Sequence, residues 1–220
     1  MQKFDTPAPV TAILSIPAGR VQVIAADRAD TTVEVVAADP AKSRDTKTAE
    51  QVTVTCTGGI LRITAPDANR LIGPSGSVEV TVQLPAGSRL EAKTGSAELR
   101  GVGRLGDVVF DGAYRHIKID EAAGVRLTAV DGDVEIGRLG GPAEISTARG
   151  DIRITEAVRG TVVLSTQSGD ISVGAAAGVS AALDAGTGHG RIVNALKNDG
   201  TVELDIRATT PQGDITARSL

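Results

Sequence analysis

Apolar and polar residues alternate along most of the chain, most clearly in its second half. The segments VRLTAVDGDVEI (125–136), AEISTARGDIRI (143–154) and VVLSTQSGDISV (162–173) each contain two alternating runs joined by a Gly-Asp or similar turn. A period of two residues is typical of β-strands that bury one face. Each segment therefore predicts two strands connected by a tight turn.

The same strand–turn–strand unit recurs from about residue 90 to the end of the chain. Weaker copies are LEAKTGSAEL (90–99), VVFDGAYRHIKI (108–119), LDAGTGHGRIVN (183–194) and VELDIRATTPQGDITA (202–217), which makes seven copies in all, about 20 residues apart. A repeat of this size predicts a β-solenoid, in which each coil buries its apolar face against its neighbours. We expect these two-strand coils to stack in the order of the sequence.

The alternation assigns side chains of the second strands to the inside or the outside of the stack. The predicted inward pairs are Ala97/Leu99, Ile117/Ile119, Val134/Ile136, Ile152/Ile154, Ile171/Val173, Ile192/Asn194 and Ile215/Ala217. The outward residues of the first four copies alternate in sign: Glu98, Lys118, Glu135 and Arg153. Arg126 and Glu144 form a similar pair on the first strand. Opposite charges on adjacent strands stabilise one register, so we interpret these six residues as a register device and a candidate interaction face.

The first 89 residues also have the character of strands. Expected strands cover 10–16, 21–25, 32–36, 52–56, 60–64 and 78–84, with a hairpin turn at Gly58-Gly59 and surface loops at 39–51 and 66–76. IPAGRVQV (16–23) is similar to LPAGSRLEA (84–92), and each Pro-Ala-Gly is expected to turn the chain into a new coil. We therefore predict an all-β, single-domain β-solenoid over 1–220, in which residues 1–89 start the stack and residues 90–220 form a seven-coil region.

These motifs carry a resemblance to a known family. The opening alternating strand with Pro-Ala-Gly, the second copy at 84–87 and the series of T-x-x-GD-[VI]-x-[IV] turns resemble the bacterial putative-adhesin family of β-strand-repeat domains of unknown function. The resemblance extends from about Val10 to Ala217. It implies a β-strand-repeat fold, supplies no catalytic signature, and implies surface association because such domains often adjoin a signal peptide or membrane segment.

Composition narrows the classes of partner. The chain has 41% hydrophobic residues but only 1% aromatic ones, so the core must be built from Val, Ile, Leu and Ala. The net charge is −4 and no dense Lys/Arg cluster is present, which argues against nucleic acid as a partner. Residues 1–9 contain no apolar signal segment, and no stretch approaches the 18 or so apolar residues of a membrane span. As written, the chain is expected to be cytoplasmic and not inserted in a membrane.

Two short motifs are better explained by the repeat than by chemistry. GVGRLG (101–106) matches the dinucleotide fingerprint, but that motif needs a helix immediately afterwards and a strand pattern follows here. We interpret it as a glycine-rich turn between coils. Arg149-Gly150-Asp151 spells a tripeptide that some cell-surface receptors bind, yet it is also the repeat's own turn, where Gly accepts positive φ and Asp bonds the backbone.

Asp133, Asp151 and Asp170 are expected to lie in one column, as in calcium-binding solenoids. Calcium would relieve their repulsion, although the glycine-rich nonapeptide of such binders is absent. Arg191 follows next in the expected stack and could neutralise Asp170 and Asp214 instead. The turn-forming role is favoured, with weak calcium binding as the alternative.

The remaining candidate groups do not form a catalytic constellation. His116 and His189 are expected four coils apart, or about 19 Å, too far to share a metal or a proton. Cys56 is the only cysteine and has no nearby His, so it is interpreted as a small hydrophobe. We therefore expect no enzyme activity, no cofactor and no catalytic residue.

Two functions are consistent with these features. The first is a non-enzymatic binding or scaffold protein whose charged face meets a protein partner. The alternative is a structural protein that self-associates into filaments or oligomers, because residues 216–220 end directly after the last coil and leave its strand exposed. Arg207, Pro211 and Arg218 would partly protect that edge.

Overall fold

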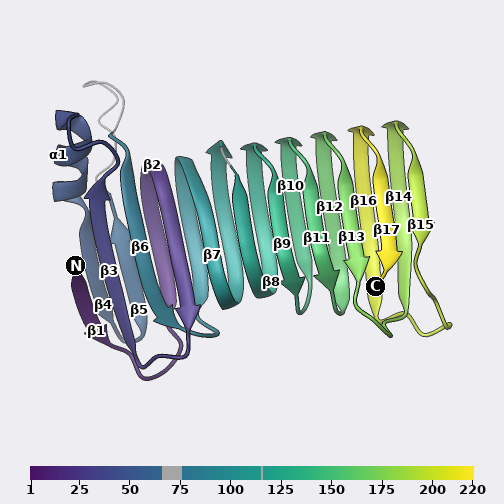
Figure 1. Cartoon of the computed structure of the whole chain (residues 1–220), viewed down its shortest axis with the longest axis horizontal. Helices are drawn as coiled ribbons and strands as arrows, with labels where there is room; N and C mark the ends of the chain where they lie inside the picture. Colours follow the sequence, from purple (N-terminus) through teal and green to yellow (C-terminus); the bar gives the residue numbers. More distant parts are fainter. Residues whose placement is uncertain (66–75, 115) are drawn as a thin grey trace.

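The computed structural model describes residues 1–65, 76–114 and 116–220, which form 17 strands and one short helix (Figure 1). The strands are β1 (Gln2–Asp5), β2 (Thr11–Ala26), β3 (Asp30–Ala37), β4 (Thr53–Thr57), β5 (Ile60–Thr64), β6 (Val78–Pro85), β7 (Arg89–Tyr114), β8 (Ile117–Asp131), β9 (Val134–Leu139), β10 (Ala143–Arg149), β11 (Ile152–Ala157), β12 (Gly160–Ser168), β13 (Ile171–Ala175), β14 (Ala181–His189), β15 (Ile192–Ala195), β16 (Leu204–Gln212) and β17 (Ile215–Ser219). The helix is α1 (Ser43–Gln51). The expected all-β fold is confirmed.

The chain winds into a two-layer solenoid whose coils follow one another along the long axis (Figure 1). Each coil places one strand in each layer, and corresponding strands of adjacent coils pair in parallel, as β10 does with β8 and β12. The long strands β2 and β8 each bend at one corner from one layer into the other, and β7 bends at two. Apolar side chains from both layers, among them Leu127, Ile145, Ile136 and Ile154, fill the space between them and are about 1% exposed.

Six of the seven predicted inward pairs are confirmed as buried. The exception is Ile192/Asn194 on β15, where Ile192 is 44% exposed and Asn194 is also exposed. The physical reason is the position of this coil, because β14 and β15 form the open end of the stack and no further coil of the described chain covers them.

The expectation that coils stack in the order of the sequence is wrong for the last two. β16 pairs with β12 on one side and β14 on the other, and β17 lies likewise between β13 and β15. The last coil of the sequence is therefore inserted one place inward (Figure 1). The connections before β14 and β16 bond to each other, since Leu204 N–H donates to the Ser180 carbonyl at 3.2 Å and Asp199 N–H donates to Ser180 Oγ at 3.1 Å.

A difference in apolar content accounts for this order. The inserted coil carries inward residues that are fully buried, with Leu204, Ile206 and Ile215 at most 1% exposed. The β14–β15 coil has Asn194 at an inward position and offers less apolar surface. Burying the more apolar coil on both sides therefore removes more apolar surface from water. The exposed strand that was expected at residues 216–220 is consequently found at β14–β15.

The two loops expected near the N-terminus have different outcomes. The charged stretch 39–51, expected as a loop, contains α1, which has no Gly or Pro and is tied down by Asp45. Asp45 is 4% exposed, and its Oδ1 accepts the N–H of Ser77 at 3.0 Å. Most of the expected loop at 66–76 lies outside the described residues. No helix among those described has the length and apolar character to cross a membrane. The single-domain organisation stays a prediction.

The tight corner between the two strands of a coil is a Gly-Asp turn that bonds to the next coil. Asp151 N–H donates to Oδ1 of Asp133 at 2.9 Å, and Asp170 N–H donates to Oδ1 of Asp151 at 2.7 Å. The series continues in the next two coils. Asp214 N–H donates to Oδ1 of Asp170 at 2.7 Å, and Arg191 N–H donates to Oδ1 of Asp214 at 2.8 Å. Each carboxylate therefore fixes the position of the next turn.

A threonine three residues before the turn glycine makes a second link between coils. Thr166 Oγ1 donates to the Gly150 carbonyl and Thr210 Oγ1 donates to the Gly169 carbonyl, both at 3.1 Å. Thr187 repeats the contact with Gly213 at 3.0 Å. The T-x-x-G-D spacing thus gives one turn a hydroxyl that donates to the preceding coil and a carboxylate that accepts from the following coil, so both groups are satisfied by backbone.

The glycine of this turn is required by both its conformation and its packing. Gly150 has a φ of +129°, which L side chains rarely adopt. A Cβ at Gly150 would overlap the carbonyl of Gly132 in the preceding coil. The coils can approach to hydrogen-bonding distance at this corner only because no side chain stands between them.

We predict that Gly150→Ala lowers the free energy of unfolding by about 2 kcal/mol or more, because it adds backbone strain and a steric overlap between coils. Gly186→Ala is the matched control, since a Cβ at Gly186 meets nothing within 4 Å. Its effect should stay within about 0.5 kcal/mol. Urea denaturation followed by circular dichroism measures both. Equal stability of the two variants would contradict the proposed role of the corner.

Candidate functional site: a groove along one corner of the solenoid

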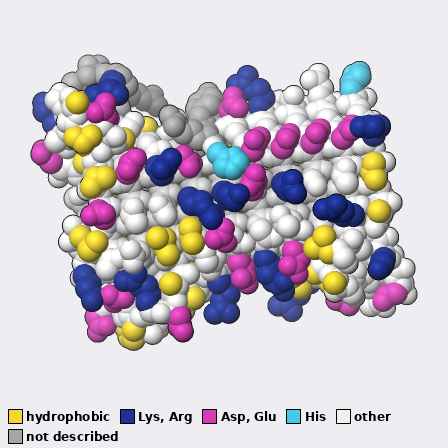
Figure 2. Space-filling model, viewed as in Figure 1, with side chains coloured by type: hydrophobic (Ala, Val, Ile, Leu, Met, Phe, Trp, Pro, Cys, Tyr) yellow, Lys and Arg dark blue, Asp and Glu magenta, His cyan; other side chains and the backbone are white. Residues whose placement is uncertain are grey.

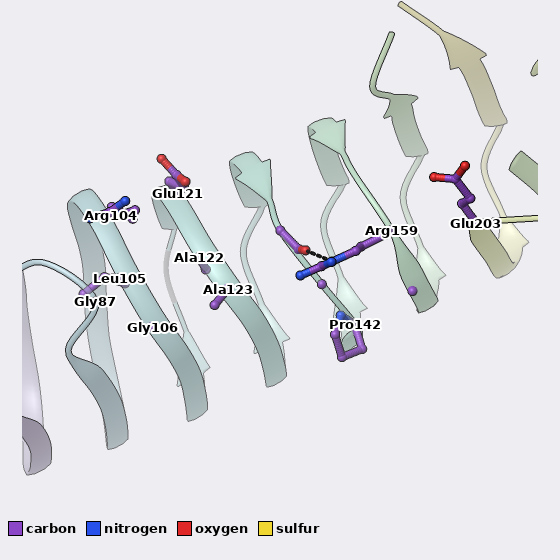
Figure 3. A pocket seen from close by; sticks show the side chains of 13 residues that line it. Gly87, Arg104, Leu105, Gly106, Glu121, Ala122, Ala123, Pro142, Arg159 and Glu203 are labelled. Atoms are coloured by element: carbon purple, nitrogen blue, oxygen red, sulfur yellow. Dashed lines mark hydrogen bonds between the residues drawn. The ribbon is translucent and has the colours of Figure 1, made fainter. Parts of the chain in front are cut away.

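A groove follows the other corner of the stack, where each coil passes into the next. It encloses about 790 Å³. Its lining comes from successive coils: Gly87, Arg104, Leu105, Gly106, Glu121, Ala122, Ala123, Gly140, Gly141, Pro142, Arg159, Gly160 and Glu203 (Figure 3). The floor consists mainly of Gly, Ala and Pro, and longer charged side chains stand at intervals along it.

The floor is bare because the coils pack closely here. A Cβ at Gly106 would lie 2.6 Å from the Gly87 carbonyl oxygen, and one at Gly141 would lie 2.6 Å from that of Ala123. Gly160 has a φ of +92°. Close stacking therefore excludes side chains from this line, and their absence produces the hollow.

Four charged side chains of alternating sign line the groove along the stack: Arg104, Glu121, Arg159 and Glu203. Among the described residues none of the four forms an ion pair within 4.0 Å. Arg159 Nε donates to the Gly140 carbonyl at 3.3 Å, which lays this side chain across the floor (Figure 3). The charged groups thus lie at the groove, where they are available to form ion pairs with a ligand.

A second hollow of about 420 Å³ continues the first along the adjacent strands. Its charged side chains are paired: Arg126 Nε lies 3.2 Å from Glu144 Oε2, and Arg89 Nη1 lies 3.7 Å from Asp107 Oδ2. Pro142 lines both hollows. The two hollows adjoin at Pro142, and the charged side chains without ion pairs among the described residues lie in the larger one.

The predicted interaction residues do not form one face. Lys118, Glu135 and Arg153 lie in register on second strands, whereas Arg126 and Glu144 lie in register on first strands. The two layers turn their inner sides to a common core, so these two sets point to opposite sides of the solenoid. Figure 2 shows basic and acidic side chains interleaved on one of these sides. Their use as an interaction face stays a prediction.

The predicted place of Glu98 in this series is wrong. The strand register aligns Lys118 with Arg100, and Glu98 lies opposite Arg20, whose Nη2 is 3.3 Å from Glu98 Oε2. The spacing to the next coil here is 18 residues, whereas the alignment of turns assumed 20. Arg100 avoids its like-charged neighbour by pairing with Asp120 at 2.7 Å.

The rest of the predicted alternation holds in the register. Lys118 Nζ lies 2.7 Å from Glu135 Oε2. The hydrogen bond from Lys118 holds the pKa of the Glu135 carboxyl below its ordinary value, with a further contribution from Arg153, while desolvation acts in the opposite direction. A second alternating column, Arg104, Glu121, Arg138 and Glu156, went unrecognised in the sequence. Its signal is the change of sign at steps of 17 or 18 residues.

The acidic column runs Asp133, Asp151, Asp170, Asp214 and then Arg191, because the last coil is inserted. Figure 2 shows a row of acidic side chains along the stack. Arg191 Nη2 lies 2.7 Å from Asp214 Oδ2 and lowers the pKa of that carboxyl. Arg191 therefore neutralises Asp214 directly and is one coil removed from Asp170. Across the described ranges no three His, Cys, Asp or Glu side chains gather as a metal site.

The two short motifs lie where the repeat requires them. Residues 101–106 lie within β7 at a bulge between Gly101 and Arg104, and strand continues after them. The Arg149-Gly150-Asp151 turn is used internally, since Arg149 Nη2 lies 2.8 Å from Asp131 Oδ2 and Asp151 belongs to the acidic column.

The remaining candidates are far from one another. His116 and His189 are five coils apart and not four, because the last coil of the sequence is inserted before the one that holds His189. Cys56 is partly buried on β4, and burial raises the pKa of its thiol.

The stacked parallel coils and their Gly-Asp corners define a β-solenoid repeat protein. The chain belongs to the Toastrack DUF4097 family, whose model matches residues 14–219. No curated protein matches the chain.

Several solved structures are similar. A putative adhesin from Bacteroides fragilis has 13% identity and a TM-score of 0.53, over 100% of this chain and 95% of the other. A putative cell adhesion protein from Clostridium sporogenes has 10% identity and a TM-score of 0.42, over 100% and 98% of the two chains. A putative lipid binding protein from Parabacteroides distasonis has 13% identity and a TM-score of 0.47, over 98% and 95%. The first of these shares the fold.

For the acidic column we predict that millimolar calcium or a chelator leaves the melting temperature unchanged. One oxygen of Asp133, of Asp151 and of Asp170 already accepts a backbone N–H, so the column has a structural use without a cation. Differential scanning fluorimetry in calcium, in magnesium and in chelator measures this. A rise specific to calcium that is lost in Asp151→Asn would establish the alternative, a calcium-binding column.

For the Lys118–Glu135 pair we predict a contribution to stability that disappears in acid. Because the pKa of Glu135 is lowered in the folded protein, this contribution is complete above the unfolded value of about 4.3 and is lost as the pH falls through the folded value. Glu135→Gln should therefore lose less stability than wild type between about pH 6 and pH 3. Urea midpoints across this range, with Ser172→Ala as a control in the same column, measure the difference. Parallel curves for wild type and Glu135→Gln would refute it.

Proposed function

We propose that the protein is a non-enzymatic binding scaffold and that its corner groove receives an extended segment of a protein partner. The observation that carries this proposal is the groove of about 790 Å³, with a floor mainly of Gly, Ala and Pro that the Arg159 side chain crosses, and four charged residues without ion pairs among the described residues. Elsewhere on the solenoid many charges pair along the stack, as in Lys118–Glu135 and Arg126–Glu144. The groove brings four charges without such partners together along one hollow.

The chemistry of the lining supports binding over catalysis. The described lining residues are Gly, Ala, Leu, Pro, Arg and Glu, without a Ser, Thr, Cys or His that would act as a nucleophile or proton carrier at neutral pH. Its two carboxylates, Glu121 and Glu203, come from coils three places apart, about 14 Å along the stack, which separates them too far to work as an acid–base pair. An apolar floor with a few placed charges is typical of sites that bind and orient a ligand. The adhesin-like role suggested by the names of the similar structures agrees with the proposal in this broad sense of binding.

The dimensions of the groove favour an extended polypeptide. Its charged residues come from several successive coils, and coils are about 4.8 Å apart, so it extends for about 20 Å. An extended chain rises about 3.3 Å per residue, and about six residues would therefore span the groove. Because Arg104 and Arg159 alternate with Glu121 and Glu203, the complementary segment carries both signs of charge.

Fluorescence anisotropy with three short labelled peptides tests this proposal: one alternates Lys and Glu, one contains only Lys and one contains only Glu as charged residues. We expect the alternating peptide to bind most tightly. Arg159→Glu should weaken it about tenfold, because reversal of one charge creates a like-charge contact costing about 1.4 kcal/mol.

Ala123→Phe should also weaken binding because the ring would fill the floor of the groove, and Ala177→Phe is the control at an exposed position outside the lining. Thermal melts confirm that each variant folds. The proposal fails if none of the peptides binds, or if the alternating peptide binds both groove variants as tightly as it binds wild type.

A further inference from the structure

The coil formed by β14 and β15 is an open end of the stack. Within the described residues each of its strands pairs with one neighbouring strand, β16 or β17, so most of the outer edge of both strands carries unpaired backbone groups. The core is also open here: the inward-facing Ile192 is 44% exposed, and Leu183 and Ala185 are only partly buried. Val193, which faces outward between Ile192 and Asn194, is 50% exposed. Apolar side chains and strand edges are thus presented together.

Most of this edge lacks the features that normally protect an edge strand; the exception is the start of β14, where the Ala181 N–H donates to the Lys197 carbonyl of the connection after β15 at 2.9 Å. Charged side chains, proline, bulges or a covering loop usually block pairing with another chain. Along β14 and β15 the sole Asp, Glu, Lys or Arg is Asp184, and there is no proline. Gly186 and Gly188 leave part of the outer side of β14 without side chains. The end is therefore suited to strand addition across both layers.

A matching partner must present two strand edges side by side, one for each layer, and flush with each other. The opposite end of this solenoid does not do so. In one layer β2 is followed by β5 and β4, whereas in the other it is followed by β6, β3 and β1. One layer is thus a strand longer than the other, and α1 packs beside β3 (Figure 1).

The open end of a second copy does match. A two-fold axis perpendicular to the stack brings two β14–β15 coils together, and it pairs their strand edges antiparallel in both layers at once. Two-fold dimers are the commonest symmetric assemblies, and the contact is self-complementary. The exposed apolar residues of both ends would then be covered by each other.

We propose that two copies associate end to end through β14 and β15 into a closed dimer that does not grow into a filament. This proposal is independent of ligand binding at the corner groove. It retains the self-association expected from the sequence, but it moves the contact from residues 216–220 to β14–β15 and limits the assembly to two chains. Growth stops because the stepped ends at β1 and β4 offer no second flush surface.

Light scattering coupled to size-exclusion chromatography across a wide range of protein concentration tests the proposal. Wild type should approach a plateau of twice 22.4 kDa, that is 44.8 kDa. Gly186→Lys combined with Val193→Lys should remain near 22.4 kDa, because the two-fold axis brings the added charges of both copies together. Gly186 accepts a side chain, since a Cβ there meets nothing within 4 Å.

The control is Ser165→Lys combined with Ser172→Lys, which adds the same charges in the same two columns but two coils further inside. Across the proposed dimer these lysines would be about 24 Å apart, well beyond the Debye length of about 8 Å. The control should therefore dimerise like wild type. A wild type that stays monomeric, a mass that rises past 44.8 kDa without a plateau, or an edge variant that dimerises as the control does would each overturn the proposal.

Discussion

The approach of one backbone turn to the next at the Gly-Asp corner is the constraint on which the rest of the structure depends. Gly150 lies directly against Gly132, and the adjoining Asp151 N–H reaches the Asp133 carboxylate at 2.9 Å. A side chain at the glycine would push the coils apart and lengthen this hydrogen bond. The corner therefore sets both the spacing between coils and the alignment of the strands that leave it. The buried inward side chains and the outward charge columns follow from this alignment.

The alternation of apolar and polar residues was sufficient to predict the strands and the inside of the stack, because a period of two is a local property of the chain. The order of the last two coils is not local. It depends on which coil would expose more apolar surface to water at the end of the stack. In the sequence, the polar Asn194 at an inward position of β15 indicates the coil that exposes less. Register is similarly sensitive, since Leu99 rather than Ala97 pairs with Ile117, and this moves Glu98 by two residues.

The groove could not be predicted from motifs because it is defined by missing side chains. Gly106, Gly141 and Gly160 were visible as turn glycines, but only the stack shows that they lie along one line. Arg104 and Arg159 both lie beside this line of glycines, although they are 55 residues apart in the sequence. A candidate binding site in a solenoid is therefore best sought in columns of equivalent positions, where the same small residue recurs while the flanking residue changes sign.

Most charged columns of the molecule are used to hold the coils in register. Lys118 with Glu135, Arg126 with Glu144 and Arg191 with Asp214 are pairs of this kind, and each satisfies its partner within the chain. A surface whose charges are already paired has little electrostatic free energy left to offer a ligand.

Two places depart from this pattern for different physical reasons. At the groove, four charges without ion pairs among the described residues stand beside a line of small residues that lets the coils stack closely. The β14–β15 end has unpaired strand edges because a linear stack must stop somewhere. Binding at the groove depends on charge and should weaken in salt, whereas association at the end depends on backbone pairing and apolar burial and should not. The salt dependence of each process therefore separates the two surfaces without a mutation.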